Sequence, residues 1–203
     1  MSQAFHYRQE VYRKLIHLSS LWMPAAIYFL ERETALWVFA ACGAVVFAYE
    51  LLRRRKNGLA RLLERLVGAA LRPEEKGGRF KPSGAVYVLA AAFLSALIFP
   101  QLVAVTALAM MLTGDAAAAL VGRRFGRKKI FDKTLEGALA FFAAALATAA
   151  VIAAAAPVAE GYLYAATAAA VVAAMVELVS KQLRLDDNLS AALAAGAVMM
   201  FLM

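Results

Sequence analysis

The sequence is poor in cysteine, histidine and charge. Cys42 is the single cysteine among 203 residues, so no intrachain disulfide can form. Charged residues make up 18%, and the 14 acidic residues are outnumbered by 22 Lys and Arg. Apolar sequence takes their place: 64% of the residues are hydrophobic, whereas a soluble domain is usually near half. Because this excess is expected to lie in lipid, the sequence predicts an all-α integral membrane protein with one domain over residues 1–203.

A helix that spans a bilayer needs about 20 mostly apolar residues. The sequence predicts about seven such segments, at residues 15–30, 34–52, 84–100, 101–121, 135–156, 161–180 and 189–203. The first and last are short, and a version in which 189–203 lies shallow in the membrane stays open. The first segment follows Arg13 and Lys14 as in a signal peptide. It carries His17 and shows no convincing cleavage site, so we expect a retained helix.

The basic residues predict the orientation of these segments. With the N-terminus inside, all but one of the 22 Lys and Arg residues fall in loops on the inner side, and only Arg32 falls outside. We therefore expect a protein of the cell (inner) membrane whose functional face is cytoplasmic. The net charge of +8 lines membrane-side loops rather than a soluble face. It favours anionic lipid head groups and nucleotide phosphates as partners and does not favour nucleic acid.

The longest inner loop has its own helical pattern. Apolar residues recur at helical spacing from Leu59 to Ala70, and Arg61, Glu64 and Arg65 lie on the opposite face. This pattern predicts an amphipathic helix over about residues 57–71 that lies flat on the cytoplasmic interface. A soluble helix that covers a core remains the alternative.

The strongest chemical signal lies around Asp115. At 1.5 Å of rise per residue, its carboxylate is about 10 Å below the inner end of its span, where an acid needs a partner or a function. Gly122 and Gly126 allow a close approach of the backbone to a ligand, and five basic residues lie between Arg123 and Lys129. Asp132 or Thr134 can cap the next helix, whose N-terminus favours an anion.

Together these residues predict a site for a polyphosphate with a divalent cation. Mg²⁺ takes one or two carboxylates plus phosphate oxygens, and Asp115 and Glu136 are the candidate ligands. The alternative is topological, with loops that hold orientation, glycines that pack helices and an Asp115 that pairs with an arginine.

Three further clusters lie on the same side. Glu50 has helical spacing to Arg53, which also suits an ordinary ion pair. Glu177 ends the sixth segment, and Asp186, Asp187 and Asn188 precede the seventh, more than one helix cap needs. Arg13 and His17 share a helix face, where His17 either orients a phosphate, shuttles a proton or is simply solvated.

At these residues the chain resembles the polyprenol kinase family, which includes dolichol kinase, phytol kinase and the CTP-dependent diacylglycerol kinase. The resemblance covers nearly the whole chain and rests on the order of several short motifs. They are Arg13-Lys14-Leu-Ile-His17, Tyr49-Glu50-Leu-Leu-Arg53-Arg54, the segments 71–75 and 83–87, Gly114-Asp115 with Gly122-Arg123-Arg124-Phe125-Gly126, Lys133-Thr134-Leu135-Glu136-Gly137, Val176-Glu177, and Asp186-Asp187-Asn188-Leu189.

The resemblance implies a kinase that moves the γ-phosphate of CTP to a membrane lipid alcohol, with Mg²⁺ as cofactor. It implies that Asp115 and Glu136 hold the metal, and that Asp115 or Glu177 accepts the hydroxyl proton. The expected catalytic set is Asp115, Lys133, Glu136 and Glu177. The expected nucleotide- and phosphate-binding set is Arg13, Lys14, His17, Arg53, Gly114, Gly122, Arg123, Arg124, Gly126, Lys128, Thr134, Asp187 and Asn188.

The sequence differs from the polyprenol kinase family at two places, and two other functions are possible alternatives. Ala116 and the stretch after Asn188 lack prolines that are common in the family, which concerns local helix geometry.

The motifs also resemble the CDP-diacylglycerol synthase family, a cytidylyltransferase that attacks the α-phosphate of CTP, but its longer C-terminal signature is absent. A small lipid or solute transporter is the third possibility, although it predicts ionisable residues near mid-membrane. The acceptor alcohol and the oligomeric state stay open.

Overall fold

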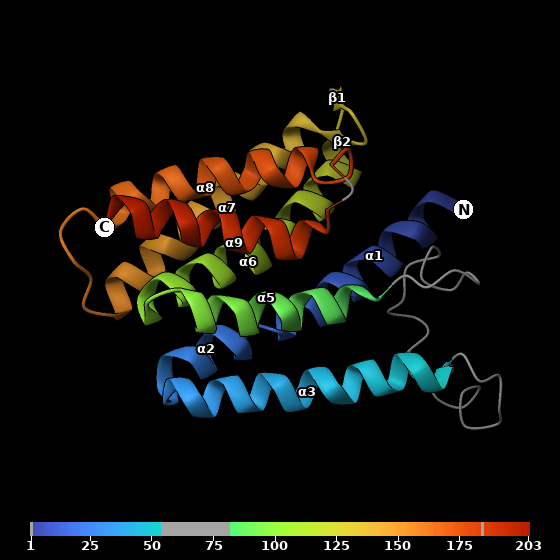
Figure 1. Cartoon of the computed structure of the whole chain (residues 1–203). Coiled ribbons are helices and arrows are strands. Elements are labelled where there is room, and N and C mark those ends of the chain that lie inside the picture. Colours follow the sequence, from blue (N-terminus) through green and yellow to red (C-terminus); the bar gives the residue numbers. More distant parts are fainter. Residues whose placement is uncertain (1, 54–81, 184) are drawn as a thin grey trace.

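A computed structural model describes residues 2–53, 82–183 and 185–203. The described residues are almost entirely helical, as predicted (Figure 1). The helices are α1 (Ser2–Ser19), α2 (Trp22–Phe29), α3 (Arg32–Arg53), α5 (Gly84–Ile98), α6 (Gln101–Phe125), α7 (Leu135–Ala155), α8 (Tyr162–Val179) and α9 (Asp187–Leu202). A short hairpin of β1 (Lys129–Ile130) and β2 (Lys133–Thr134) joins α6 to α7. The predicted interfacial helix at 57–71 lies outside the described residues.

Four helices in the described part of the chain are long and apolar enough to cross a membrane, namely α3, α6, α7 and α8. The helices α5 and α9 are also apolar but shorter. Most predicted segments match observed helices to within a few residues at each end, α6 extending furthest beyond its prediction. The composition and the helix lengths are therefore compatible with a helical membrane protein.

The first predicted segment, 15–30, is wrong as a single helix, because the chain turns between α1 and α2. Pro24 has no backbone N–H and cannot bond to the carbonyl oxygen of Ser20 in the α-helical pattern. That oxygen accepts instead from Met23 N at 2.9 Å, and Leu21 N donates to Leu18 O at 3.0 Å. These tighter bonds close one helix and start the next.

Helix α6 is the centre of the bundle. It packs against α1, α2, α5, α7, α8 and α9. In its apolar 18-residue stretch 78% of the residues are buried, whereas the corresponding share is 17% in both α3 and α7. Small residues allow this close packing. Gly114 on α6 faces the Phe141 ring of α7, and a Cβ at Gly114 would lie 2.8 Å from that ring. Because α6 is enclosed on most sides, a charged residue on it must find partners on neighbouring helices.

The two ends of the bundle differ in what they carry. The N-terminus, the β1–β2 hairpin and the start of α9 lie at one end, and the C-terminus lies at the other (Figure 1). Asp115 lies in the half of α6 that leads to the hairpin end. This arrangement brings the second half of α1, the end of α8 and the beginning of α9 around the same stretch of α6.

Candidate functional site

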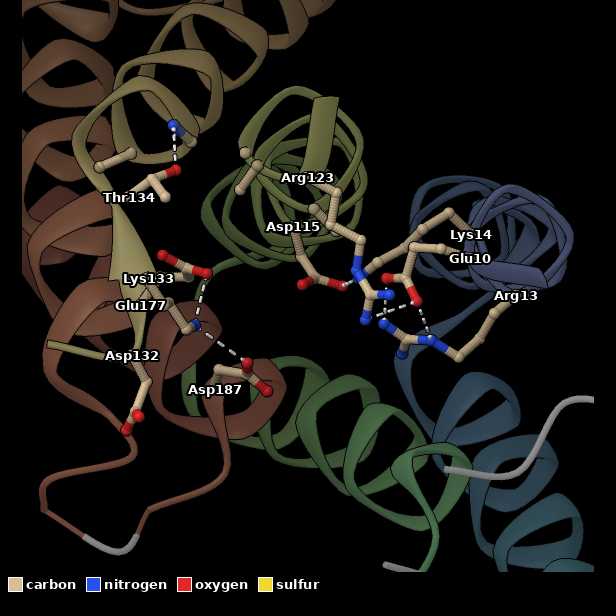
Figure 2. Close-up of a pocket in the computed structure, with 15 residues that line it drawn as sticks. Glu10, Arg13, Lys14, Asp115, Arg123, Asp132, Lys133, Thr134, Glu177 and Asp187 are labelled. Carbon is tan, nitrogen blue, oxygen red and sulfur yellow. Dashed lines mark hydrogen bonds and ion pairs between the residues drawn. The ribbon is translucent and has the colours of Figure 1, made fainter. Parts of the chain in front are cut away.

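A cavity of about 250 Å³ opens at the hairpin end of the bundle (Figure 2). Its walls come from α1, α6, α7, α8, α9 and the β1–β2 hairpin, so segments far apart in the sequence meet there. The lining residues are Glu10, Arg13, Lys14, Asp115, Ala118, Ala119, Gly122, Arg123, Asp132, Lys133, Thr134, Gly137, Ala138, Glu177 and Asp187. Nine of these fifteen carry ionisable side chains, which is unusual for a cavity among apolar helices.

Three carboxylates from three helices converge in this cavity. Asp115 of α6, Glu177 of α8 and Asp187 of α9 each offer an oxygen, and these oxygens lie within 4.8 Å of one another. Asp115 is 6% exposed and Glu177 is 4% exposed. Acids so close together and so little hydrated need positive charge beside them to stay ionised. We refer to Asp115, Glu177 and Asp187 as the acidic cluster.

Two lysines supply that charge. Lys14, which is buried, donates a short hydrogen bond from Nζ to Asp115, and His17 Nε2 lies 3.1 Å from the same carboxylate oxygen. Lys133 Nζ donates to Glu177 and lies 3.2 Å from Asp187 Oδ2 (Figure 2). Burial alone lowers the pKa of Lys133, but the carboxylates of Asp187 and Glu177 outweigh it and raise that pKa above its usual value. Lys133 therefore stays charged at neutral pH.

A second charged group lies at the mouth of the cavity. Glu10, on α1, accepts from Arg13 Nη2 at 2.5 Å and from Arg13 Nε at 3.2 Å. Its other contact is with Arg123 of α6, whose Nη2 lies 3.2 Å from Oε2. Two guanidinium groups from different helices thus share one carboxylate (Figure 2).

The loop between α6 and α7 points Lys133 at the acidic cluster. Helix α6 ends at Phe125, and the antiparallel pair of Ile130 with Lys133 turns the chain back toward the bundle. The Thr134 hydroxyl then caps α7 by accepting from Gly137 N at 3.2 Å. A Cβ at Gly122 would lie 2.9 Å from this hydroxyl. The glycines at 122 and 137 let α6 and α7 approach closely enough to hold the cap and Lys133 in place.

The structure brings together ten residues of the predicted site. They are Arg13, Lys14, His17, Asp115, Gly122, Arg123, Lys133, Thr134, Glu177 and Asp187. Gly122 serves helix packing as well as lining the cavity.

Glu136, however, does not join Asp115 as the sequence predicted. It does not line the cavity, and its carboxylate accepts from the backbone N–H of Lys128 at 3.2 and 3.3 Å. Its position in the first turn of α7 is one where a carboxylate satisfies backbone donors. The acids that accompany Asp115 are Glu177 and Asp187 instead.

Other predicted residues also lie away from the cavity. Gly114 packs against Phe141, and Gly126 lies under the Thr134 side chain. The Arg124 guanidinium stacks on the Phe125 ring at 5.4 Å, and Lys128 is exposed. Asn188 is buried beside Asp187 without lining the cavity. Arg53 ends α3, and its side chain lies outside the described residues.

Sequence reasoning missed Glu10 and underused Asp132. Glu10 precedes Arg13 by three residues and Lys14 by four, the spacings that place side chains on one helix face. That spacing was a usable signal. Asp132 was considered only as a helix cap, but it lines the cavity and lies 3.6 Å from Lys181 Nζ.

Comparisons with known proteins give relatives without a described activity. The chain is 25% identical over 184 residues to the uncharacterized protein RP860 of Rickettsia prowazekii, covering 88% of this chain and 87% of that protein. It is 27% identical over 185 residues to the uncharacterized protein MJ1137 of Methanocaldococcus jannaschii, covering 89% of this chain and 87% of that protein. No family model matches the chain. No solved structure matches it either.

Proposed function

We propose that this protein is a membrane-embedded kinase that transfers the γ-phosphate of CTP to the hydroxyl group of a membrane lipid alcohol. The observation that carries the proposal is the convergence of the acidic cluster with Lys14, Lys133, Arg13 and Arg123 around one cavity at the end of an apolar bundle. A charged cavity beside lipid-facing helices suits a reaction between a water-soluble polyphosphate and an apolar alcohol. The resemblance to the polyprenol kinase family supports the same reaction.

The acidic cluster fits a divalent cation. Mg²⁺ binds oxygens at about 2.0–2.1 Å, so two ligands on opposite sides of it lie about 4.2 Å apart. The three oxygens within 4.8 Å of one another need only small side-chain rotations to reach such spacings. Asp115, Glu177 and Asp187 would hold Mg²⁺, in place of the pair of Asp115 with Glu136. The bound ion would supply charge neutralisation for the phosphate oxygens.

The basic residues around the cluster would bind and orient the phosphates. Phosphoryl transfer depends mostly on positioning and charge neutralisation rather than on covalent chemistry by the protein. Lys133 and Lys14 extend from opposite walls toward the carboxylates, and Arg13 and Arg123 lie at the cavity mouth. In the proposed reaction, a carboxylate of the acidic cluster accepts the proton of the attacking hydroxyl group.

The proposed setting is a chain that crosses the cell membrane seven times with its N-terminus in the cytoplasm. The broken pair α1–α2 forms the first crossing, and α5 and α9 form two of the others. The basic residues of the predicted inner loops support this orientation. CTP would enter from the cytoplasm, and the alcohol would arrive from the inner leaflet, whose anionic head groups would attract the same loops.

Labelled CTP tests the proposal directly. The purified protein, in nanodiscs with Mg²⁺, would receive CTP labelled at either the α- or the γ-phosphate, together with phytol, a polyprenol, farnesol or diacylglycerol. We expect γ-label, and no α-label, in one class of alcohol. Transfer of α-label to lipid would indicate a cytidylyltransferase. Absence of both labels, with no binding of CTP, would contradict any CTP-dependent enzyme and favour transport.

A further inference from the structure

Glu10 has no role in the proposed reaction, yet it is among the most buried charged residues at the cavity. It is 5% exposed, and all of its ion-pair contacts that the described residues show are with arginines. Two guanidinium groups, one from α1 and one from α6, balance the charge of this buried carboxylate.

The contacts leave most of the arginine donors free of Glu10. A guanidinium carries five N–H groups in a rigid fork. Arg13 uses its Nε and Nη2 on Glu10, and Arg123 uses its Nη2. Both side chains line the cavity, and Arg123 is 52% exposed. The remaining donors suit phosphate oxygens, which arginine binds through paired hydrogen bonds.

Two guanidinium groups so close together need a reason to stay there. They carry like charge, and the half-exposed Arg123 side chain would lose rotational freedom by remaining beside Arg13. Glu10 offsets both the repulsion between the two guanidinium groups and the entropy lost by Arg123, because its carboxylate bridges an arginine of α1 and an arginine of α6. The bridge fixes the pair at the cavity mouth, and along α6 its Arg123 lies about two helical turns beyond Asp115 of the acidic cluster.

We propose that Glu10 is a positioning residue that holds Arg13 and Arg123 together as a clamp for the phosphate chain of a nucleotide. This inference rests on the proposed function for the identity of the nucleotide, but the clamp itself requires only a polyphosphate. Glu10 touches no reacting atom in this arrangement and acts through the two arginines. Its removal should therefore weaken phosphate binding more than it slows the transfer step.

The test compares Glu10→Gln with Glu33→Gln, a matched change at an exposed glutamate in the first turn of α3. Kinetics of γ-phosphate transfer would give KM for CTP and kcat, and calorimetry would give Kd for inorganic tripolyphosphate. We expect Glu10→Gln to raise KM and Kd about tenfold with kcat within about threefold of wild type, as for loss of one charge-assisted contact. Glu33→Gln should change neither.

A double-variant cycle separates positioning from a general structural role. If Glu10 acts through the clamp, Glu10→Gln should add little to the raised Kd of a variant that already carries Arg13→Gln and Arg123→Gln. An additive loss, or a fall in thermal stability with Kd for tripolyphosphate unchanged, would overturn the inference. So would a large fall in kcat with KM unchanged, because that pattern belongs to a group at the reacting atoms.

The two measurements also separate this inference from the proposed function. If γ-transfer occurs but Glu10→Gln leaves KM and Kd unchanged, the clamp is wrong and the kinase proposal stands. If no transfer occurs but tripolyphosphate binds in a Glu10-dependent way, the kinase proposal is wrong and the clamp stands.

Discussion

Two cavities along α6 show how differently one helix can be used. The cavity at the hairpin end measures about 250 Å³ and is lined largely by ionisable groups. The other, of about 550 Å³, lies between α2, α6 and α7 in the opposite half of the bundle. Its lining is apolar apart from a few hydroxyl groups, and it includes Leu21, Pro24, Phe29, Val105, Ala109, Thr113, Thr148, Val151 and Ile152.

Among the described residues, the larger cavity is lined by no Asp, Glu, His, Lys or Arg. Its polar side chains include Thr113 and Thr148, whose hydroxyl groups lie 2.8 Å apart and satisfy each other. The smaller cavity holds all three members of the acidic cluster. The proposed function therefore rests on charge that is buried and paired across helices, and not on the volume or apolar character of a cavity.

The largest expected effect comes from removing one carboxylate of the acidic cluster. Glu177→Gln should lower γ-phosphate transfer by at least about 100-fold, because the proposed metal ligand becomes neutral while Lys133 loses an ion-pair partner. The matched change Glu136→Gln should cost little activity, because the contacts of Glu136 in the described part of the chain are with backbone N–H groups, among them that of Lys128. Steady-state rates at several Mg²⁺ concentrations give both values.

The two variants, Glu177→Gln and Glu136→Gln, distinguish between the two proposed sets of metal ligands. A large loss in Glu136→Gln with normal activity in Glu177→Gln would restore Asp115 and Glu136 as the metal ligands and contradict the acidic cluster. Equal losses with equal falls in thermal stability would remove the distinction between the two glutamates.

A middle-sized effect is expected between the two cavities, at Gly114. A Cβ there would lie 2.8 Å from the Phe141 ring, which is fully buried and cannot move aside. Gly114→Ala should therefore destabilise the fold by about 1–2 kcal/mol, the overpacking cost less the gain in helix propensity. Gly43→Ala is the matched control, because nothing lies within 4 Å of a Cβ there, and it should stabilise by about 0.5–1 kcal/mol.

Thermal unfolding followed by tryptophan fluorescence gives these shifts, which at about 2–4 °C per kcal/mol are measurable in a chain of this size. KM for CTP should stay unchanged in Gly114→Ala, since Gly114 packs helices. A raised KM with an unchanged melting temperature would return Gly114 to the nucleotide-binding set that the sequence predicted.

The helices were largely predictable because an apolar environment selects both the hydropathy and the length of a helical segment. The boundaries of α3 and α5 to α9 follow the apolar runs closely, since charged and proline-containing loops end them. The break between α1 and α2 was not predicted, because the run through 15–30 is apolar on average and the interruption depends on a single missing N–H at Pro24. Hydropathy also does not predict which helix is most buried inside the bundle, because α3 and α6 have similar mean hydropathy but very different burial.

The site was predictable in its residue types and less so in its pairings. Asp115 and Glu177 stood out because acids in apolar sequence are costly near lipid. Asp187 stood out because three polar residues in a row are more than a helix cap needs. Which acid accompanies Asp115 depends on how α8 and α9 meet α6, and that is set by packing across more than 60 residues of chain. Glu136 is close in sequence to Lys133 but points to the backbone of the loop. Glu10 was recoverable from its spacing to Arg13 alone.

The smallest expected effect lies in the apolar cavity, and it sharpens the contrast between the two ends. Thr148→Val removes the hydroxyl pair with Thr113, but Thr113 Oγ1 can still donate to Ala109 O at 2.9 Å. Because no buried donor is orphaned, the loss should be about 1 kcal/mol or less, and γ-transfer should not change. Thr167→Val on α8, where the hydroxyl is bonded among the described residues only to Leu163 O, should cost still less. If Thr148→Val instead lowered transfer to long alcohols while leaving both the melting temperature and KM for CTP unchanged, the apolar cavity would be part of the substrate site, and the division of α6 into a reactive end and an inert end would be wrong.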